Sequence, residues 1–126
     1  MSEHAYIERR PGPYQAQHGE DKWLERYFNG RRHGFFVEVG AYDGVVLSNT
    51  YYFEQHGWTG VLVEPDPIKA QECRANRPRS VTFECAAVAR GDPAQITFNK
   101  VSGGEVYSTV SLTEDHKKRL QEYGLN

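Results

Sequence analysis

The sequence has little of what marks several large classes of protein. Its only two cysteines, Cys73 and Cys85, form no CxxC pair and have no metal-ligand spacing. We therefore expect two buried, free thiols in a reducing compartment, the cytoplasm. The 5 histidines show neither HxxxH nor HExxH spacing, so the sequence predicts no metal site.

Neither a charge of one sign nor a long apolar run dominates the chain. The formal net charge is -2 and the pI is about 6.2. Nucleic acid is therefore not an expected partner. No segment approaches the roughly 20 apolar residues of a membrane span, and none resembles a signal peptide. The sequence thus predicts a cytoplasmic protein without a membrane partner.

The length of 126 residues suffices for one small domain. Leu, Ile, Val and Phe together number 26, just above the roughly 20% level below which chains tend to stay disordered. The predicted core is therefore thin. Residues 1–13 are polar and end in Pro11-Gly12-Pro13, which indicates a loose arm before a single domain at 14–126.

Apolar periodicity predicts helices that alternate with strands. We expect helices at 20–29, 48–56 and 68–76, and strands at 34–39, 60–64 and 81–85. A β arm with a strand at 95–98, a loop at 101–112 and a final helix at 113–124 should follow.

The order βαβαβ predicts an α/β fold with a parallel sheet in the order 1-2-3, which is half of a doubly wound sheet. The first strand would then lie at an open, apolar edge. Three consequences stay open: the chain is incomplete, it pairs with a second copy as a homodimer, or the loop and final helix cover the edge.

Two strand ends carry acids at a spacing that indicates nucleoside binding. Phe35-Phe36-Val37-Glu38-Val39 runs into the turn Gly40-Ala41-Tyr42-Asp43-Gly44, and Val61-Leu62-Val63 ends in Glu64. A strand, a tight turn, a helix, a second strand and an acid form the arrangement with which α/β proteins hold an adenosine ribose. The sequence therefore predicts a ligand that contains a nucleoside.

The turn favours S-adenosylmethionine over a dinucleotide, because Tyr42 stands where the dinucleotide fingerprint has its second glycine. We expect Gly40 to let a ligand approach the backbone and free N–H groups after it to bind a carboxylate. Glu38 would bind an amine, directly or through water, and Glu64 would accept both ribose hydroxyls. The alternatives are a turn without a ligand and, for Glu64, a cap on the next helix.

Further segments have two readings each. Glu84-Cys85-Ala86 ends the third strand, where small side chains either leave room for an adenine ring or simply close the strand. Within Gln17-His18-Gly19-Glu20-Asp21, the two acids suit a helix start as well as a lid over the ligand. Asp66 is the expected cap of the third helix, which Pro67 begins.

Several of these segments, taken in order, resemble the FkbM-type methyltransferases. They are Gln17-His18-Gly19-Glu20-Asp21, residues 34–44, Ser48-Asn49-Thr50, residues 57–65, Asn76-Arg77-Pro78 and Cys85-Ala86-Ala87-Val88. The resemblance spans about residues 14–98. It implies a class I methyltransferase (Rossmann-like) fold and O-methylation with S-adenosylmethionine, on a hydroxyl of a small molecule or saccharide.

The resemblance also implies roles for individual residues. The predicted cofactor-binding set consists of Glu38, Gly40, Ala41, Asp43 and Gly44 at the methionine end, Glu64 at the ribose, and Cys85 and Ala86 at the adenine, together with Tyr42, Ser48 and Pro65. The general base is not assigned, and Asp43, Glu20 and His18 are candidates.

Members of that family continue into a D-x-E-G segment that nothing after Phe98 matches. The resemblance therefore implies that this chain carries the N-terminal, cofactor-binding half. The alternatives are a non-catalytic or self-associating S-adenosylmethionine-binding module and a nicotinamide-binding unit.

Overall fold

The computed structural model describes residues 8–91, and residues 9–87 form one compact unit. The predicted strand at 95–98, loop at 101–112 and helix at 113–124 lie outside the described residues. At the start of the unit, Arg9 donates a hydrogen bond to the Tyr51 hydroxyl and Arg10 to the Gln17 carbonyl, at 2.9 and 3.0 Å. The part of the expected loose arm from residue 9 onward is thus attached to the unit.

Helices and strands alternate along the described residues, as the periodicity predicts. They are α1 (Glu20–Tyr27), β1 (Phe35–Val39), α2 (Tyr51–Gln55), β2 (Thr59–Val63), α3 (Pro67–Asn76) and β3 (Val81–Phe83). The three strands are parallel, in the order β1-β2-β3. The prediction of an α/β fold with this strand order is confirmed, and the arrangement is compatible with a Rossmann-like methyltransferase fold.

Two helix starts show how the local sequence sets the element bounds. Asp66 caps α3 as predicted, because its Oδ1 accepts hydrogen bonds from the Ile68 and Lys69 N–H groups at 2.9 and 3.4 Å. The start of α2 differs from the prediction. The Ser48 hydroxyl accepts from the N–H groups of Thr50 and Tyr51 at 3.1 and 3.0 Å, so it supports a helix that begins three residues later.

The third strand is also shorter than predicted, and this corrects one expectation about the thiols. Cys73 is buried on α3, as expected, but Cys85 is exposed. Because β3 ends at Phe83, Cys85 lies in the following segment and leaves the sheet. The prediction of two buried thiols is therefore wrong for Cys85.

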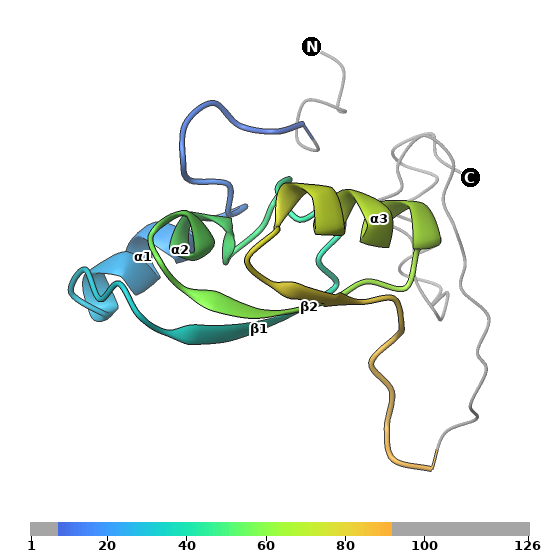
Figure 1. Ribbon diagram of the computed structural model, residues 1–126. Helices are drawn as coiled ribbons and strands as arrows, with labels where there is room; N and C mark the ends of the chain where they lie inside the picture. Colours follow the sequence, from blue (N-terminus) through green and yellow to red (C-terminus); the bar gives the residue numbers. More distant parts are fainter. Residues whose placement is uncertain (1–7, 92–126) are drawn as a thin grey trace. The chain divides into compact units, whose positions relative to one another are not determined.

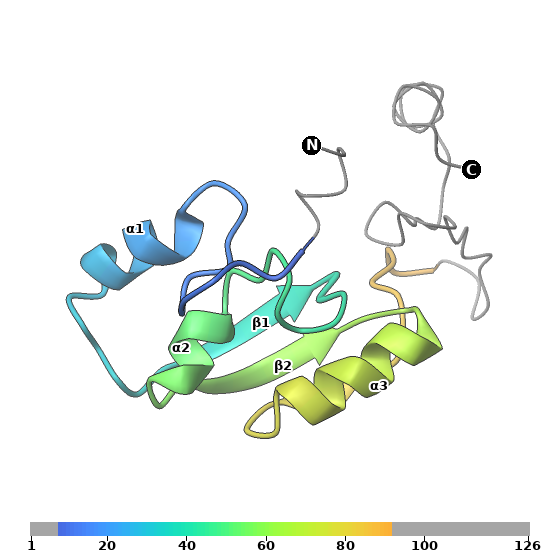
Figure 2. The same ribbon diagram turned by 90° about the horizontal axis from the view of Figure 1, so that it is seen from above.

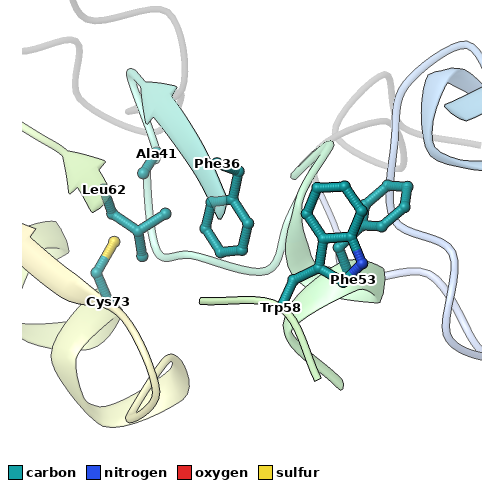
Figure 3. Packing of buried hydrophobic residues seen from close by; sticks show 6 residues of the cluster. All are labelled: Phe36, Ala41, Phe53, Trp58, Leu62 and Cys73. Atoms are coloured by element: carbon teal, nitrogen blue, oxygen red, sulfur yellow. The ribbon is translucent and has the colours of Figure 1, made fainter. Parts of the chain in front are cut away.

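The core lies on one side of the sheet. In Figures 1 and 2, α2 and α3 cover the same face of β1 and β2. Figure 3 shows the buried apolar cluster between these helices and the sheet, which consists of Phe36, Ala41, Phe53, Trp58, Leu62 and Cys73. Leu62 of the central strand and Cys73 of α3 are fully buried. Ala41, the second residue of the turn after β1, belongs to this cluster, so core packing anchors the turn.

The opposite face of the sheet is apolar and exposed. Phe35, Val37, Val39, Val81 and Phe83 are each more than half exposed. Val37 and Val81 flank Val61 in register, and side chains two residues apart on a strand share a face. Among residues 8–91, β1 pairs only with β2. The first strand therefore forms an apolar edge, as predicted.

Candidate functional site

The turn after β1 is fastened to the end of β2 by its own backbone. The N–H groups of Gly40 and Ala41 both donate to the Val63 carbonyl, at 2.8 and 3.1 Å, and the Tyr42 N–H donates to Glu64 Oε2 at 2.7 Å. We expected free N–H groups here for a ligand carboxylate. These three are already bonded within the protein, so a ligand must be held by other groups.

The next N–H groups of the turn are also occupied. Asp43 Oδ1 accepts from the Val45 and Val46 N–H groups at 2.9 and 2.8 Å. The carboxylate of Asp43 thus shapes the chain between β1 and α2, in the manner of a helix cap.

The two glycines of the turn face different surroundings. Both have positive φ, +76° at Gly40 and +87° at Gly44, a region that side chains with a Cβ disfavour. A Cβ on Gly40 would meet nothing within 4 Å, whereas one on Gly44 would lie 2.8 Å from Arg77 Cγ and 3.3 Å from Cys73 Cα. Gly40 therefore borders open space that a ligand can enter. The lack of a side chain at Gly44 allows α3 to pack closely against the turn.

Glu64 follows the central strand, where all three strand ends meet. The side chain is buried, with 6% exposed. Besides the Tyr42 N–H, its carboxylate accepts the Asp66 N–H at 3.1 Å. The Glu64 N–H donates to the Phe83 carbonyl at 3.0 Å. Glu64 thus connects the turn after β1, the start of α3 and the end of β3.

Burial also changes the acidity of Glu64. Burial, aided by the negative charge of Asp66, raises the pKa of the Glu64 carboxyl, although hydrogen bonds from the Asp66 and Tyr42 N–H groups oppose the rise. A carboxylate oxygen can accept two hydrogen bonds. Each oxygen of Glu64 accepts one backbone N–H, so each keeps capacity for a ligand hydroxyl.

Glu38 was predicted to bind a ligand amine, but its carboxylate is already bound by several groups of the protein. Its carboxylate accepts from the Ser48 hydroxyl and the Asn49 N–H, both at 2.9 Å, and from the Thr50 hydroxyl at 2.5 Å. Arg77 Nη1 lies 3.6 Å from its Oε2. These four contacts point the carboxylate toward the segment before α2, which favours an indirect role toward a ligand.

Arg77 is the organising residue that the sequence reasoning missed as part of the site. The side chain is fully buried, and its guanidinium donates to Glu54 Oε1 at 3.0 Å, the Gly44 carbonyl at 2.9 Å and the Thr50 hydroxyl at 2.8 Å. It therefore joins α3, α2 and the turn after β1. Glu54 also accepts a hydrogen bond from the Ser80 hydroxyl.

A weak signal for this network exists in the sequence. Arg77 directly precedes Pro78 at the end of a helix, and Glu54 follows Tyr52-Phe53 on the side of α2 that should be buried. A buried charge needs a partner, so an acid and an arginine on inward-facing helix positions indicate a pair.

Of the other predicted cofactor residues, Tyr42 lies beside Glu64. The Tyr42 backbone carbonyl accepts a hydrogen bond from the Cys73 thiol at 2.9 Å, and Lys69 Nζ lies 4.5 Å from the centre of the Tyr42 ring. Burial, together with the charges of nearby carboxylates, raises the pKa of Cys73 to about 12. Cys85 and Ala86 follow β3, and neither side chain is buried.

The two acids in the first turn of α1 bind the loop that precedes the helix. Asp21 is buried, and its Oδ2 accepts from the Gln15 and Ala16 N–H groups at 2.9 and 3.0 Å. Glu20 accepts the His18 N–H at 2.8 Å. These contacts agree with the reading of a helix start, and the predicted lid over the ligand stays a prediction.

Two further findings concern residues 8–91 only. No group of three or more His, Cys, Asp or Glu side chains there could hold a metal ion. None of the helices in this range is both long and apolar enough to cross a bilayer.

Comparison with known proteins bears on what this arrangement does. Residues 38–124 match a family model described as the Methyltransferase FkbM domain. No curated protein and no solved structure matches the chain. The matched region begins at Glu38 and contains the turn, Glu64 and Arg77, and it covers more than half of the chain. The chain therefore belongs to the FkbM methyltransferase family.

Proposed function

We propose that this chain binds S-adenosylmethionine and serves in the O-methylation of a hydroxyl group on a small molecule or saccharide, as the cofactor-binding half of the enzyme. The observation that carries the proposal is the meeting of three parallel strand ends at Glu64, beside open space at Gly40. Ligands of open α/β sheets bind outside the carboxyl ends of the strands. Membership of a methyltransferase family supports the same conclusion.

The residues fit the chemistry of this cofactor. The Glu64 oxygens keep capacity for the two ribose hydroxyls. The uncrowded side of Gly40 suits the methionine end, and the small side chains of Cys85 and Ala86, with Pro65, would border the adenine. Gly44 and Ser48 are buried, so in this proposal they shape the site from behind.

The protein's task in such a reaction is mainly one of placement. When bound, S-adenosylmethionine supplies a methyl group that is already activated. The chain then has to align the reactants and exclude water. The Arg77 network holds Glu38 and the residues before α2 in one arrangement, which suits this task.

A hydroxyl acceptor also loses a proton, and three side chains were candidates for the base. The carboxylates of Asp43 and Glu20 already accept backbone N–H groups. The His18 imidazole has no hydrogen bond to any of the described residues. This difference favours His18 among the three.

Calorimetry with S-adenosylmethionine and S-adenosylhomocysteine tests the cofactor proposal. We expect both to bind, and Glu64→Ala to weaken binding by about 2–4 kcal/mol, because two charge-assisted hydrogen bonds to the ribose are lost. Glu72→Ala is the matched control, since the Glu72 side chain is partly exposed on α3 and pairs with Lys69 of the same helix. The absence of binding at millimolar concentration, or tighter binding of NAD, would contradict the proposal. Turnover on a hydroxylated acceptor then separates an enzyme from a non-catalytic module.

A further inference from the structure

A shallow pocket of about 520 Å³ lies between the start of α1 and the segment that leads into α2. It is lined by His18, Gly19, Glu20, Trp23, Leu24 and Asn49. Its volume falls in the range of about 300–1,000 Å³ that is usual for small-molecule sites. Besides its size, the pocket has three features that point to a ligand.

The first feature is a set of polar side-chain groups without partners. The imidazole of His18, the side-chain amide of Asn49 and the indole N–H of Trp23 make no hydrogen bond to any described residue. Polar groups that converge on an apolar pocket without being used by the protein are typical of groups that orient a ligand.

The second feature is a fixed aromatic wall. Trp23 is 63% exposed, yet its ring stacks on Tyr27 with centroids 5.4 Å apart and an interplanar angle of 14°. Leu24 beside it packs against the core. A ring that is held in place contributes apolar contact area at a low cost in conformational entropy.

The third feature is the charge of the lining. Among residues 8–91, no lysine or arginine lines the pocket, and the one carboxylate from this range, Glu20, already accepts the His18 backbone N–H at 2.8 Å. The pocket therefore offers no cation to an acidic ligand. An amide, an imidazole and an indole N–H suit neutral hydroxyl groups, which both donate and accept hydrogen bonds.

The pocket also adjoins the proposed cofactor site through one residue. Asn49 lines the pocket, and its backbone N–H donates a hydrogen bond to Glu38 Oε1 at 2.9 Å. Glu38 stands two residues before Gly40 on the chain. A ligand in the pocket would therefore lie next to the segment that leads to the turn.

We propose that this pocket is the part of the acceptor site that the cofactor-binding half contributes, and that the acceptor is a neutral ring that carries hydroxyl groups. The C–H face of the ring packs on Trp23, and its hydroxyls bond Asn49 and His18. The assignment as acceptor site rests on the proposed function, whereas the assignment as a binding site for such rings does not.

Tryptophan fluorescence tests the pocket without any cofactor. The second tryptophan, Trp58, is buried, so a ligand at the pocket changes chiefly the emission of Trp23. The probes are methyl glucopyranoside, methyl galactopyranoside and myo-inositol. We expect a saturable change with at least one probe, with a dissociation constant on the order of 1 mM.

Substitutions of the lining residues test whether the change in fluorescence comes from the pocket. Asn49→Ala removes the side-chain amide but keeps the backbone N–H, and we expect it and His18→Ala to weaken binding at least about fivefold, since each loses a hydrogen bond of about 1 kcal/mol or more. His33→Ala is the matched control because this exposed histidine does not line the pocket, and it should bind like the parent chain. Trp23→Ala should abolish the emission change.

The outcomes separate this inference from the proposed function. No saturable change with any probe up to about 100-fold above the expected constant, or equal binding by Asn49→Ala and His18→Ala, would overturn the pocket assignment, even if S-adenosylhomocysteine binds. Binding of a probe without binding of S-adenosylhomocysteine would keep the ring site and contradict its role as acceptor site.

Discussion

At the scale of single residues, the site depends on two acids, the half-buried Glu38 and the buried Glu64, that differ in what surrounds them. Glu38 is held by hydroxyl groups and an arginine, whereas among the described residues the Glu64 carboxylate accepts hydrogen bonds only from backbone N–H groups. Glu38 therefore has little capacity left for a ligand, and Glu64 retains some. Arg77 contributes to this difference, because its Nη1 lies 3.6 Å from Glu38 Oε2.

Arg77→Met should destabilise the chain by about 3–5 kcal/mol, because it leaves Glu54 and Glu38 without their buried counter-charge. Urea unfolding followed by circular dichroism measures the loss. Arg74→Met is the control, since Arg74 is exposed on the same helix, and it should cost less than about 0.5 kcal/mol. Equal effects of the two variants would show that the buried network contributes nothing.

Glu64 should make cofactor affinity depend on pH. Only the ionised carboxylate accepts both ribose hydroxyls, and burial raises the pKa of Glu64. Affinity should therefore be full above this raised pKa and fall as the pH drops through it, at a higher pH than for an ordinary glutamate. Calorimetry with S-adenosylhomocysteine between pH 4.5 and 8 measures the profile, for which Glu64→Gln is the control. If the profile of the parent chain matches that of Glu64→Gln, Glu64 does not bind the ribose.

The same shift has a consequence for the free chain. Because the folded state holds this proton more tightly than the unfolded state, the contribution of Glu64 to stability decreases as the pH rises from the ordinary to the raised pKa.

The sequence predicted the residues whose role is local, and it missed those that act across the fold. Asp66 contacts N–H groups two and three residues ahead, so its role can be read from the adjacent proline and helix pattern. Arg77 contacts Glu54 and Gly44, which are 23 and 33 residues away. Such a network exists only once the sheet and helices are assembled, and the local pattern indicates only that the two buried charges need partners.

At the scale of elements, the turn between β1 and α2 is held in place by contacts with both β2 and α3. Backbone bonds tie it to β2, and Gly44 lets α3 approach it. The strand order and the acid after β2 were predictable because period and spacing determine them. The start of α2 was not, because the Ser48 hydroxyl accepts the N–H groups of Thr50 and Tyr51 as a cap would, yet the helix itself begins only at Tyr51.

Two alanine substitutions in this turn should differ in cost. Gly40→Ala and Gly44→Ala both place a Cβ at positive φ, which costs about 1–2 kcal/mol. Gly44→Ala should cost about 1–3 kcal/mol more, because its Cβ would meet Arg77 and Cys73. Urea unfolding of the two variants measures the difference, and equal losses would mean that α3 does not pack on Gly44.

At the scale of the whole molecule, the sheet has one covered and one exposed face. Because parallel sheets are normally covered on both faces, the apolar side chains of β1 and β3 call for a partner surface. Of the alternatives that the sequence left open, one can be tested directly: we propose that a second copy of the chain pairs at the edge of β1.

Light scattering at increasing concentration should therefore show self-association, and Val37→Lys should reduce it. Val37 is 62% exposed on the edge strand, and a lysine there opposes edge pairing. Gln71→Lys places the same charge at an exposed position of α3 and should leave association unchanged. A parent chain that stays monomeric would contradict this prediction.

The central claim is that the strand ends around Glu64 hold an adenosyl ligand, and backbone amide NMR tests it most directly. Addition of S-adenosylhomocysteine should shift the amide signals of residues 40–44, Glu64 and residues 85–86, while those of the outer face of α3 stay in place. Unchanged signals at millimolar ligand, or changes confined to residues away from the strand ends, would contradict the account.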